Sequence, residues 1–314
     1  MIVVTGGAGF IGSNLVHALN RQLDEDILVV DDLTDGAKFR NLIGTHISDY
    51  WDKDELIERL PALKPLRAVF HLGACTTTTE WDGRYMMQNN YVYSRRLLDL
   101  CAGHGIPFIY ASSAAVYGRG ADFREGAARM EPLNVYGYSK LLFDQYVLRR
   151  FSSFQSQVVG LRYFNVYGPR EQHKGPMASV AYHCYCQLLE RGRVCLFEGS
   201  DGYTNGEQRR DFVLVDDVVA VHLWFLSNSD KSGIFNVGAG RSQSFNDLAN
   251  AVIAHHGSGF IEYIPFPRQL LGCYQSYTQA DMGALREAGY GGEFRTVEQG
   301  VASYMQWLST QRIA

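Results

Sequence analysis

A glycine-rich turn near the start of the chain constrains the fold of this 314-residue sequence more than any other feature. The turn, Gly7-x-Gly9-x-x-Gly12, follows a β-branched run at 2–4 and precedes apolar residues at helical spacing in 13–23. A second apolar run at 27–30 ends in Asp31. A dinucleotide-binding βαβ unit requires this order, because the glycines let backbone N–H groups reach a pyrophosphate at the positive end of the helix dipole. We therefore expect a dinucleotide at this turn.

Strand-like and helix-like segments alternate through the first half of the chain. Strands are expected at 46–48, 65–72, 107–111 and 157–163, and helices at 53–60, 91–101 and 139–151. This alternation predicts an α/β fold with a doubly wound, parallel Rossmann sheet, which binds its ligands beyond the carboxyl ends of the strands. The runs 213–218 and 233–238 are expected to be strands that rejoin this sheet.

The alternation weakens after residue 168, where aromatic residues, prolines and polar loops become more frequent. We expect residues 1–168 and 211–240 to form the dinucleotide-binding Rossmann domain. Residues 169–210 and 241–314 are expected to contribute mainly to a smaller, discontinuous α/β lobe that binds substrate.

The overall composition argues against several kinds of partner. The net charge of −4 provides no basic face for nucleic acid or a membrane surface. We find neither an apolar stretch of about 20 residues nor the features of a signal peptide, so a cytoplasmic location is expected. The six cysteines are scattered and are expected to be free, buried thiols. Cys184-x-Cys186 fits no common zinc spacing, and no metal site is expected.

Three residues near the expected strand ends could carry proton transfer. Tyr136 and Lys140 are four apart and share a helix face, and Ser113 follows the strand at 107–111. The positive charges of Lys140 and an oxidised nicotinamide would favour phenolate and lower the pKa of Tyr136, so that it could accept a hydroxyl proton. Ser113 could bind the same substrate oxygen. Alone, this spacing also fits an ordinary helix start with a packed tyrosine; Tyr138 is a second phenol but points elsewhere on the helix.

In these motifs the chain resembles the nucleotide-sugar branch of the extended short-chain dehydrogenase/reductase family. The matching motifs are Thr5-Gly6-x-x-Gly9-x-x-Gly12, Ser113, Tyr136-x-x-x-Lys140 and the octapeptide at 162–169, and the likeness covers nearly the whole chain. More specific segments are 78–83, 85–87, 134–140, 173–175, 177–181, 197–200, 274–275 and 278–281. The resemblance implies an epimerase that oxidises one carbinol of a nucleotide sugar, an ADP-linked heptose, and returns hydride to its opposite face. It also implies a homo-oligomer, by likeness a pentamer.

Inversion through a ketone requires the intermediate to present both faces to one hydride, with a proton relay suited to each orientation. Tyr136 would serve one epimer, and the resemblance implies that Lys174 in His173-Lys174-Gly175 serves the other as a second acid/base. Burial or nearby positive charge could lower the pKa of Lys174 enough for it to exchange a proton. Without the resemblance, Lys174 reads as an exposed or phosphate-binding loop lysine.

The sequence gives conflicting signals about the cofactor. Asp31 at the end of a strand would accept the ribose 2′-hydroxyl and favour NAD. The resemblance instead implies NADP, with Lys38 and Lys53 neutralising a 2′-phosphate, although both also read as solvated surface lysines. We expect NADP, with NAD as the alternative. The remaining implied cofactor contacts are Gly6, Gly9, Phe10, Ile11, Gly12, Asp32, Leu72, Gly73, Ala74, Cys75, Thr76, Asn89, Lys140 and Val166.

A further set of residues is implied to hold the nucleotide sugar: Asn165, His183, Phe197, Glu198, Gly199, Ser200, Arg210 and Tyr274. Arg210 is the expected diphosphate partner, because guanidinium binds phosphate oxygens in pairs; a surface salt bridge is its alternative. Two departures from the family pattern matter. Pro176 stands where a serine is common, and the loop 201–208 is long and leaves Arg209 as a competitor of Arg210.

Three other functions remain open. A sugar 4,6-dehydratase is disfavoured because Ala114-Ala115 follow Ser113 where such enzymes carry an acid pair. A UDP-hexose 4-epimerase is opposed mainly by the specific segments above. A noncatalytic NADP-binding protein would not need Ser113, Tyr136 and Lys140.

Overall fold

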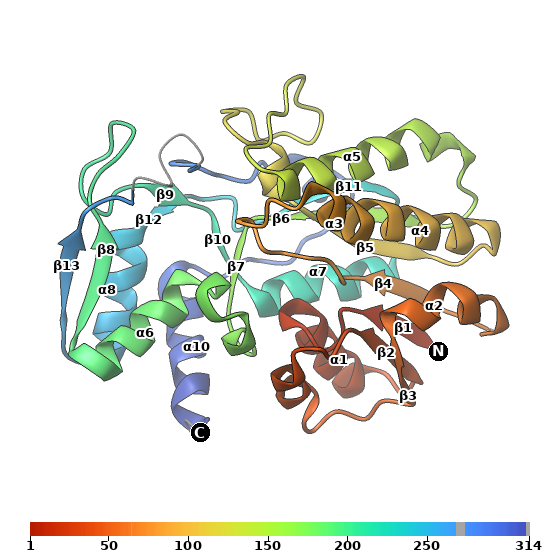
Figure 1. Cartoon of the computed structure of the whole chain (residues 1–314), viewed down its shortest axis with the longest axis horizontal. Coiled ribbons are helices and arrows are strands. Elements are labelled where there is room, and N and C mark those ends of the chain that lie inside the picture. Colours follow the sequence, from red (N-terminus) through yellow and green to blue (C-terminus); the bar gives the residue numbers. More distant parts are fainter. Residues whose placement is uncertain (64, 268–273, 312–314) are drawn as a thin grey trace.

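A computed structural model describes residues 1–63, 65–267 and 274–311 of the chain. Its centre is a seven-stranded parallel sheet with the order β11-β6-β5-β4-β1-β2-β3 (Figure 1). The strands are β1 (Ile2–Thr5), β2 (Ile27–Asp31), β3 (Asp49–Asp52), β4 (Ala68–His71), β5 (Phe108–Ser113), β6 (Val158–Tyr163) and β11 (Gly233–Val237). The direction of strand addition reverses between β1 and β4, which opens a crevice at their carboxyl ends. The predicted fold class is confirmed.

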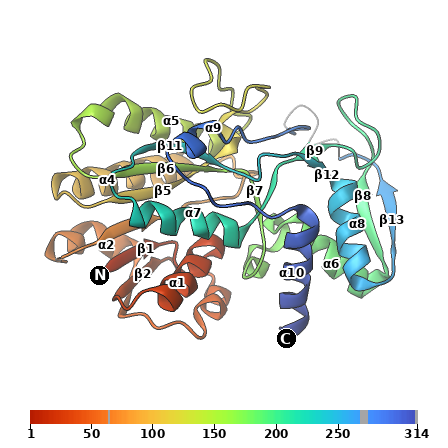
Figure 2. The same ribbon diagram turned by 180° about the vertical axis from the view of Figure 1, so that it is seen from behind.

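Helices cover both faces of this sheet (Figure 2). One face carries α1 (Phe10–Gln22), α7 (Val215–Ser227) and α9 (Gly283–Glu287), and the other α2 (Lys53–Arg59), α4 (Tyr93–Gly103) and α5 (Val135–Arg150). Ile2 and Val4 pack toward α1, whereas Val3 between them packs toward α4. Burial on both faces explains why the strands are nearly continuous apolar runs.

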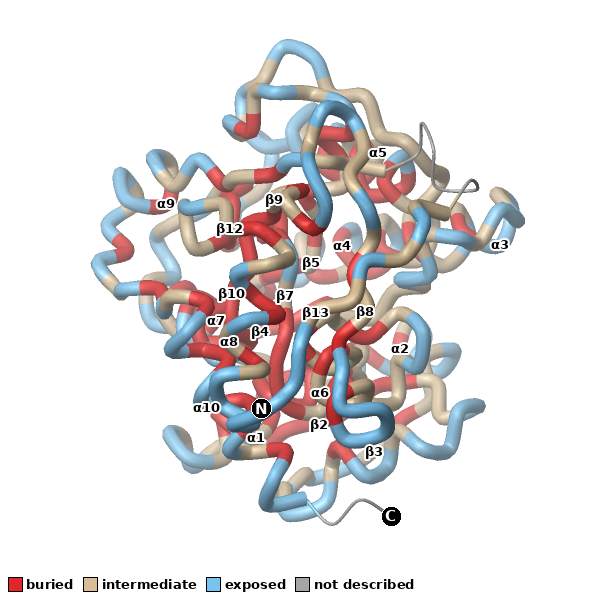
Figure 3. The backbone as a smooth tube through the Cα atoms, turned by 90° about the vertical axis from the view of Figure 1, so that its left-hand side faces the viewer, coloured by how far each residue is buried: buried red, intermediate tan, exposed pale blue. Residues whose placement is uncertain are grey.

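A second lobe lies beside the sheet (Figure 1, left) and has its own buried core. It contains α6 (Val180–Arg191), α8 (Phe245–His256), α10 (Val297–Thr310) and the parallel pair β8 (Arg193–Phe197) and β13 (Phe260–Ile264). Between the lobes run two short pairs, β7 (Asn165–Tyr167) with β10 (Phe212–Leu214) and β9 (Arg209–Arg210) with β12 (Gln243–Ser244). Figure 3, which colours each residue by its burial, shows buried residues in both parts. Leu285, Tyr290 and Phe294 of the last segment pack in the sheet core; the domain boundaries stay a prediction.

Short helical segments complete the described chain. They are η1 (Gly36–Leu42), η2 (Leu60–Ala62), α3 (Gly83–Met87), the π-helical η3 (Gln88–Val92), η4 (Ala114–Val116), η5 (Phe151–Ser153) and η6 (Gln172–Met177). No helix in the described ranges is long and apolar enough to cross a membrane.

Two predicted strands are wrong. The segment 46–48 is a loop, and β3 starts at Asp49 because the ladder with β2 begins at the pair Leu28–Asp49. The run 213–218 does not rejoin the main sheet: β10 pairs with β7, and α7 begins at Val215. Two acidic residues in the first turn of α7 favour a helix there. The predicted strand 233–238 joins the sheet as β11.

The five cysteines in the described part of the chain are free, as predicted. Cys101 and Cys184 are buried, but Cys75, Cys186 and Cys195 are only half-buried, so the expectation of burial is wrong for these three. Cys75 is half-buried because it follows β4 at the open edge of the sheet. Cys273 lies outside the described residues.

Candidate active site

A cleft of about 1130 Å³ opens at the carboxyl edge of the sheet and extends to the second lobe. It brings together most of the predicted site residues. These are Gly6, Gly9, Phe10, Ile11, Gly12, Asp31, Asp32, Lys38, Lys53, Leu72, Gly73, Ala74, Cys75, Thr76, Asn89, Ser113, Tyr136, Lys140, Asn165, Val166, Lys174, Phe197, Arg210 and Tyr274. The volume exceeds that of ordinary small-molecule pockets and suits two extended ligands.

The glycine turn forms one end of the cleft and fits a pyrophosphate. Gly6 has φ +67°, and a Cβ there would lie 2.6 Å from the backbone N of Gly73. A Cβ on Gly12 would lie 2.1 Å from the carbonyl oxygen of Gly6. Gly9 is the N-cap residue of α1 and has no side chain to cap it, so the first backbone N–H groups of the helix stay available to a ligand.

The end of β2 forms a compact corner of paired charges. Asp31 is buried and accepts hydrogen bonds from Ala8 N–H (2.8 Å) and the Lys38 ammonium (2.6 Å). Lys53 pairs with Asp32 at 2.8 Å, and its hydrogen bond lowers the pKa of that carboxyl. Neither lysine is a free surface charge in this arrangement.

Helix α5 holds Tyr136 and Lys140 against the end of β5. Lys140 is buried, and its ammonium donates to the carbonyl oxygen of Ala111 (2.9 Å). Burial lowers the pKa of Lys140 to about 8, although the charge of Asp144 raises it. Tyr138 is 51% exposed and lies off the cleft, as its spacing predicts.

The protein's own groups raise the pKa of Tyr136 instead of lowering it. Burial is the largest cause, and the hydrogen bond with Ser113 only partly opposes it. Among the protein's own groups the expected lowering is not observed, and the part that an oxidised nicotinamide would contribute stays a prediction. The physical reason is that desolvation of the phenolate outweighs the favourable contacts.

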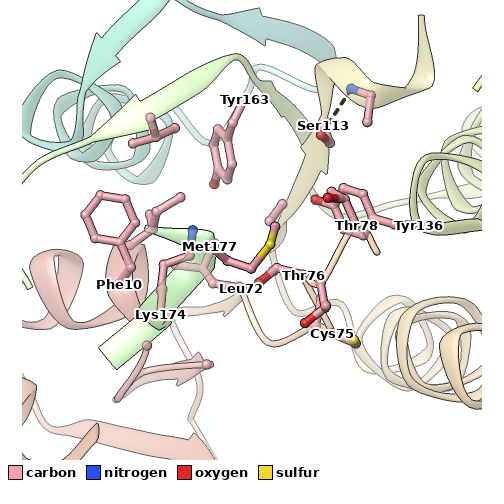
Figure 4. Close-up of a pocket in the computed structure, with 18 of the residues that line it drawn as sticks. Phe10, Leu72, Cys75, Thr76, Thr78, Ser113, Tyr136, Tyr163, Lys174 and Met177 are labelled. Carbon is pink, nitrogen blue, oxygen red and sulfur yellow. Dashed lines mark hydrogen bonds between the residues drawn. The ribbon is translucent and has the colours of Figure 1, made fainter. Parts of the chain in front are cut away.

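Lys174 reaches the same cleft from the opposite side (Figure 4). It belongs to η6, and its ammonium lies 5.5 Å from the ring centre of Phe10. Burial lowers the pKa of Lys174, and the Glu171 carboxylate raises it. The structure thus supports the expectation that burial lowers this pKa, and Tyr136 and Lys174 face each other across one space.

Arg210 forms the far wall of the cleft. It is buried between the rings of Tyr274 and Phe245, which lie 4.7 and 5.6 Å from the guanidinium carbon. No carboxylate in the described ranges forms an ion pair with it. Arg209, in contrast, donates to Ser242. Of the two arginines, Arg210 is the one that can bind an anion in the cleft.

Four predicted substrate contacts are not among the residues that line this cleft. His183 lies on α6 with its ring beside Tyr182, 6.2 Å between centres. Glu198 and Gly199 line a separate open hollow, and Ser200 accepts a hydrogen bond from Gln208. The long loop 201–208 folds back on this segment, where Gly199 N–H donates to Asn205. The unusual length of this loop was the sequence feature that could have indicated that residues 198–200 do not line the cleft.

The cleft also contains residues that sequence reasoning missed. Tyr163 ends β6 beside Lys174, Thr78 lies next to Tyr136, and Met177 lies between them (Figure 4). Tyr163 hydrogen-bonds to the buried His222 (2.7 Å). The rule that ligands lie beyond strand ends could have identified Tyr163.

A glycine-turn Rossmann sheet with a Tyr-x-x-x-Lys helix at its carboxyl edge defines a nicotinamide-dependent dehydrogenase-type enzyme. The sequence model of the NAD dependent epimerase/dehydratase family matches residues 2–238. The chain belongs to this family. It is also 61% identical to the ADP-L-glycero-D-manno-heptose-6-epimerase of Alkalilimnicola ehrlichii, over 97% of this chain and 96% of that protein.

Solved structures give the same family likeness. The ADP-L-glycero-D-manno-heptose-6-epimerase of Helicobacter pylori has a TM-score of 0.85 and 32% identity, covering 99% of this chain and 96% of that one. The UDP-N-acetylglucosamine 4-epimerase of Methanobrevibacter ruminantium has a TM-score of 0.86 and 27% identity, covering 99% and 98%. The fold therefore does not distinguish the heptose from the hexose enzymes.

Proposed function

We propose that the chain interconverts ADP-D-glycero-β-D-manno-heptose and ADP-L-glycero-β-D-manno-heptose by transient oxidation at C6. The observation that carries this proposal is the pair of proton-transfer groups, Tyr136 and Lys174, facing one cleft from opposite sides. Support for the substrate comes from the 61% identity to a heptose epimerase. Arg210, Phe197 and Tyr274 would hold the ADP portion, with Arg210 on the diphosphate.

The bound nicotinamide supplies the hydride acceptor for oxidation and the hydride donor for the return. Burial raises the pKa of Tyr136, and the positive charge of an oxidised nicotinamide would have to favour its phenolate. In one direction that phenolate would take the C6 hydroxyl proton as the C–H bond breaks and the carbonyl forms. Ser113 holds the same oxygen by a hydrogen bond. Once the ketone had turned its other face, the Lys174 ammonium would give a proton to the ketone oxygen and would be left as the neutral amine. The reverse reaction exchanges these roles, and solvent resets both groups between turnovers.

For the cofactor we propose NADP. Asp31 already accepts hydrogen bonds from Ala8 N–H, Asp32 N–H and the Lys38 ammonium, which leaves little acceptor capacity for a ribose 2′-hydroxyl. Lys38 and Lys53 offer two ammonium groups with which a 2′-phosphate could pair.

The product would serve as a precursor of the lipopolysaccharide inner core. The free cysteines suit a reducing compartment, and we propose the cytoplasm. A homo-oligomer, a pentamer by family likeness, remains part of the proposal and can be measured by light scattering.

Product stereochemistry tests the reaction directly. Purified protein with its cofactor, given ADP-D-glycero-β-D-manno-heptose and no added reductant, should form the C6 epimer, detected by NMR. In deuterated water the C6 hydrogen should be retained, because it moves as hydride. Tyr136→Phe and Lys174→Met should each slow turnover by about 10²–10⁴-fold, whereas Tyr138→Phe on the same helix should not. Full activity in both first variants would reject the two-base assignment.

The alternatives give different products. A UDP-hexose 4-epimerase would invert UDP-glucose at C4, and a 4,6-dehydratase would release a 4-keto-6-deoxy sugar. Ala114 and Ala115 follow Ser113 without a carboxyl group, which disfavours dehydration. A noncatalytic binding protein would change none of these substrates.

A further inference from the structure

Glu171 is a buried carboxylate for which the proposed reaction has no direct use. Its side chain is 0% exposed. One oxygen accepts hydrogen bonds from Gly168 N–H (3.1 Å) and the Ser179 hydroxyl (2.7 Å). The other accepts the N–H of Ser179. A carboxylate held this way has left water at a substantial cost in free energy, so its retention calls for an explanation.

The partners of Glu171 lie at the two ends of the segment that carries Lys174. We call residues 172–178 the strap. Gly168 lies just beyond β7, before the strap, and Ser179 caps α6 after it. Lys174 N–H also donates to the main-chain carbonyl of Glu171 (2.9 Å). One carboxylate therefore fastens both ends of the strap, which limits the positions that the Lys174 side chain can reach.

The charge of Glu171 acts on Lys174 as well. The described residues include no ion pair between them within 4 Å, yet the carboxylate opposes the effect of burial on the pKa of Lys174. Other titratable groups near this site are Tyr182 and Cys186 of α6 and Tyr304 of α10. Burial is the largest cause of the raised pKa of both tyrosines; Cys186 and then Glu171 add to it at Tyr182, and Glu171 comes next at Tyr304. His173 on the strap has a pKa lowered by burial and by the charges of Lys38 and Lys174. Among these groups Glu171 is the nearby source of negative charge.

We propose that Glu171 is a positioning residue for Lys174, which fastens the strap and keeps the ammonium available as a proton donor. The inference rests on the acid/base role proposed above for Lys174. A neutral side chain of the same shape could retain part of the hydrogen bonding but would not supply the charge. The two contributions can therefore be separated by substitution.

Glu171→Gln tests the charge, with Glu58→Gln on the exposed face of α2 as the matched control. The pKa of Lys174 is read by NMR after reductive ¹³C-methylation of the lysines, with the signal assigned from Lys174→Arg. In Glu171→Gln this pKa should fall by about one unit. In a plot of kcat against pH, the alkaline limb should move to lower pH by the same amount. The value of kcat should fall about tenfold, with KM nearly unchanged. The control should match the parent.

Ser179→Ala removes the hydrogen bond from the Ser179 hydroxyl to Glu171 but leaves the charge of Glu171 in place. This variant still tests the proposal if Glu171→Gln does not fold. It should lower kcat without moving the alkaline limb. An unchanged Lys174 pKa in folded Glu171→Gln would overturn the proposal, and so would a shifted limb in Ser179→Ala. Because the NMR titration needs no turnover, it still reports on Glu171 if the protein fails to epimerise an ADP-heptose, which would instead reject the proposed function.

Discussion

The buried ion pair between Asp144 and Arg162 gives a sharp test of how α5, the helix that carries Tyr136 and Lys140, is held. Asp144 lies one turn after Lys140 and is 0% exposed. It accepts hydrogen bonds from Arg162 (2.8 Å), Tyr110 (2.9 Å) and Ser112 (2.9 Å). Asp144→Asn keeps the shape but leaves the Arg162 charge buried without its partner. Removing one member of such a pair costs about 3–5 kcal/mol.

The expected fall in melting temperature can be estimated from the length of the chain. An unfolding entropy of about 2.1 cal/mol/K per residue gives about 0.66 kcal/mol/K for 314 residues. A loss of 3–5 kcal/mol then lowers Tm by about 5–8 °C, if the chain unfolds as one unit. Calorimetry and urea unfolding measure the two quantities independently.

The matched control is Asp122→Asn, which breaks an exposed ion pair with Arg124 and should leave Tm unchanged. Replacing both members of the buried pair, as in Asp144→Leu with Arg162→Met, should recover part of the loss because no charge stays unpaired. A cost below about 1 kcal/mol for Asp144→Asn, the range of surface pairs, would refute the reasoning.

Charged and titratable groups of the cleft and the core carry the remaining predictions. Arg210→Lys should raise the KM for the nucleotide sugar about tenfold with little change in kcat, since lysine cannot pair with two phosphate oxygens; steady-state kinetics measure this. Replacing Lys38 and Lys53 by alanine should weaken NADP binding about tenfold or more and NAD binding little, and calorimetric titration would contradict the cofactor assignment if both fell equally. Burial lowers the pKa of His71 to about 3 and of His222 to about 4. The unfolded chain binds these protons near pH 6.5, so the free energy of unfolding should fall as pH drops from about 6.5 to 4. In urea titrations His222→Gln should remove about 3 kcal/mol of that fall.

The sequence was sufficient for the parts of the fold that local rules determine. The strand–glycine–helix order predicts β1 and α1. The glycine at position 12 is needed there because the carbonyl oxygen of Gly6 lies too close for any side chain. The four-residue spacing of Tyr136 and Lys140 predicts a shared helix face, which α5 provides. The carboxyl edge of the sheet then predicts where the cleft lies.

Other features depend on contacts between distant segments, which spacing does not encode. The run 213–218 is apolar enough for a strand of the main sheet, but its partner is β7. The local sequence does not predict that the side chain of Asn205, in the long loop, accepts a hydrogen bond from the backbone N–H of Gly199. The pairing of Lys38 with Asp31 likewise follows from how η1 returns toward β2. Sequence reasoning correctly selected these lysines as cleft residues but did not predict their aspartate partners.

The placement of Tyr136 and Lys174, the two proposed acid/base groups, shows how a cleft between lobes would suit an inversion. Tyr136 is fixed on a long helix packed against the main sheet, so its phenol has a single approach to the substrate. Lys174 comes from a short strap that leads into the second lobe, on the other side of the same space. Under the proposed mechanism, a ketone that turns between them would keep its oxygen within reach of one proton donor in each orientation. The opposed placement of Tyr136 and Lys174 would thus let each group serve one orientation of the ketone, and the single variants Tyr136→Phe and Lys174→Met test this.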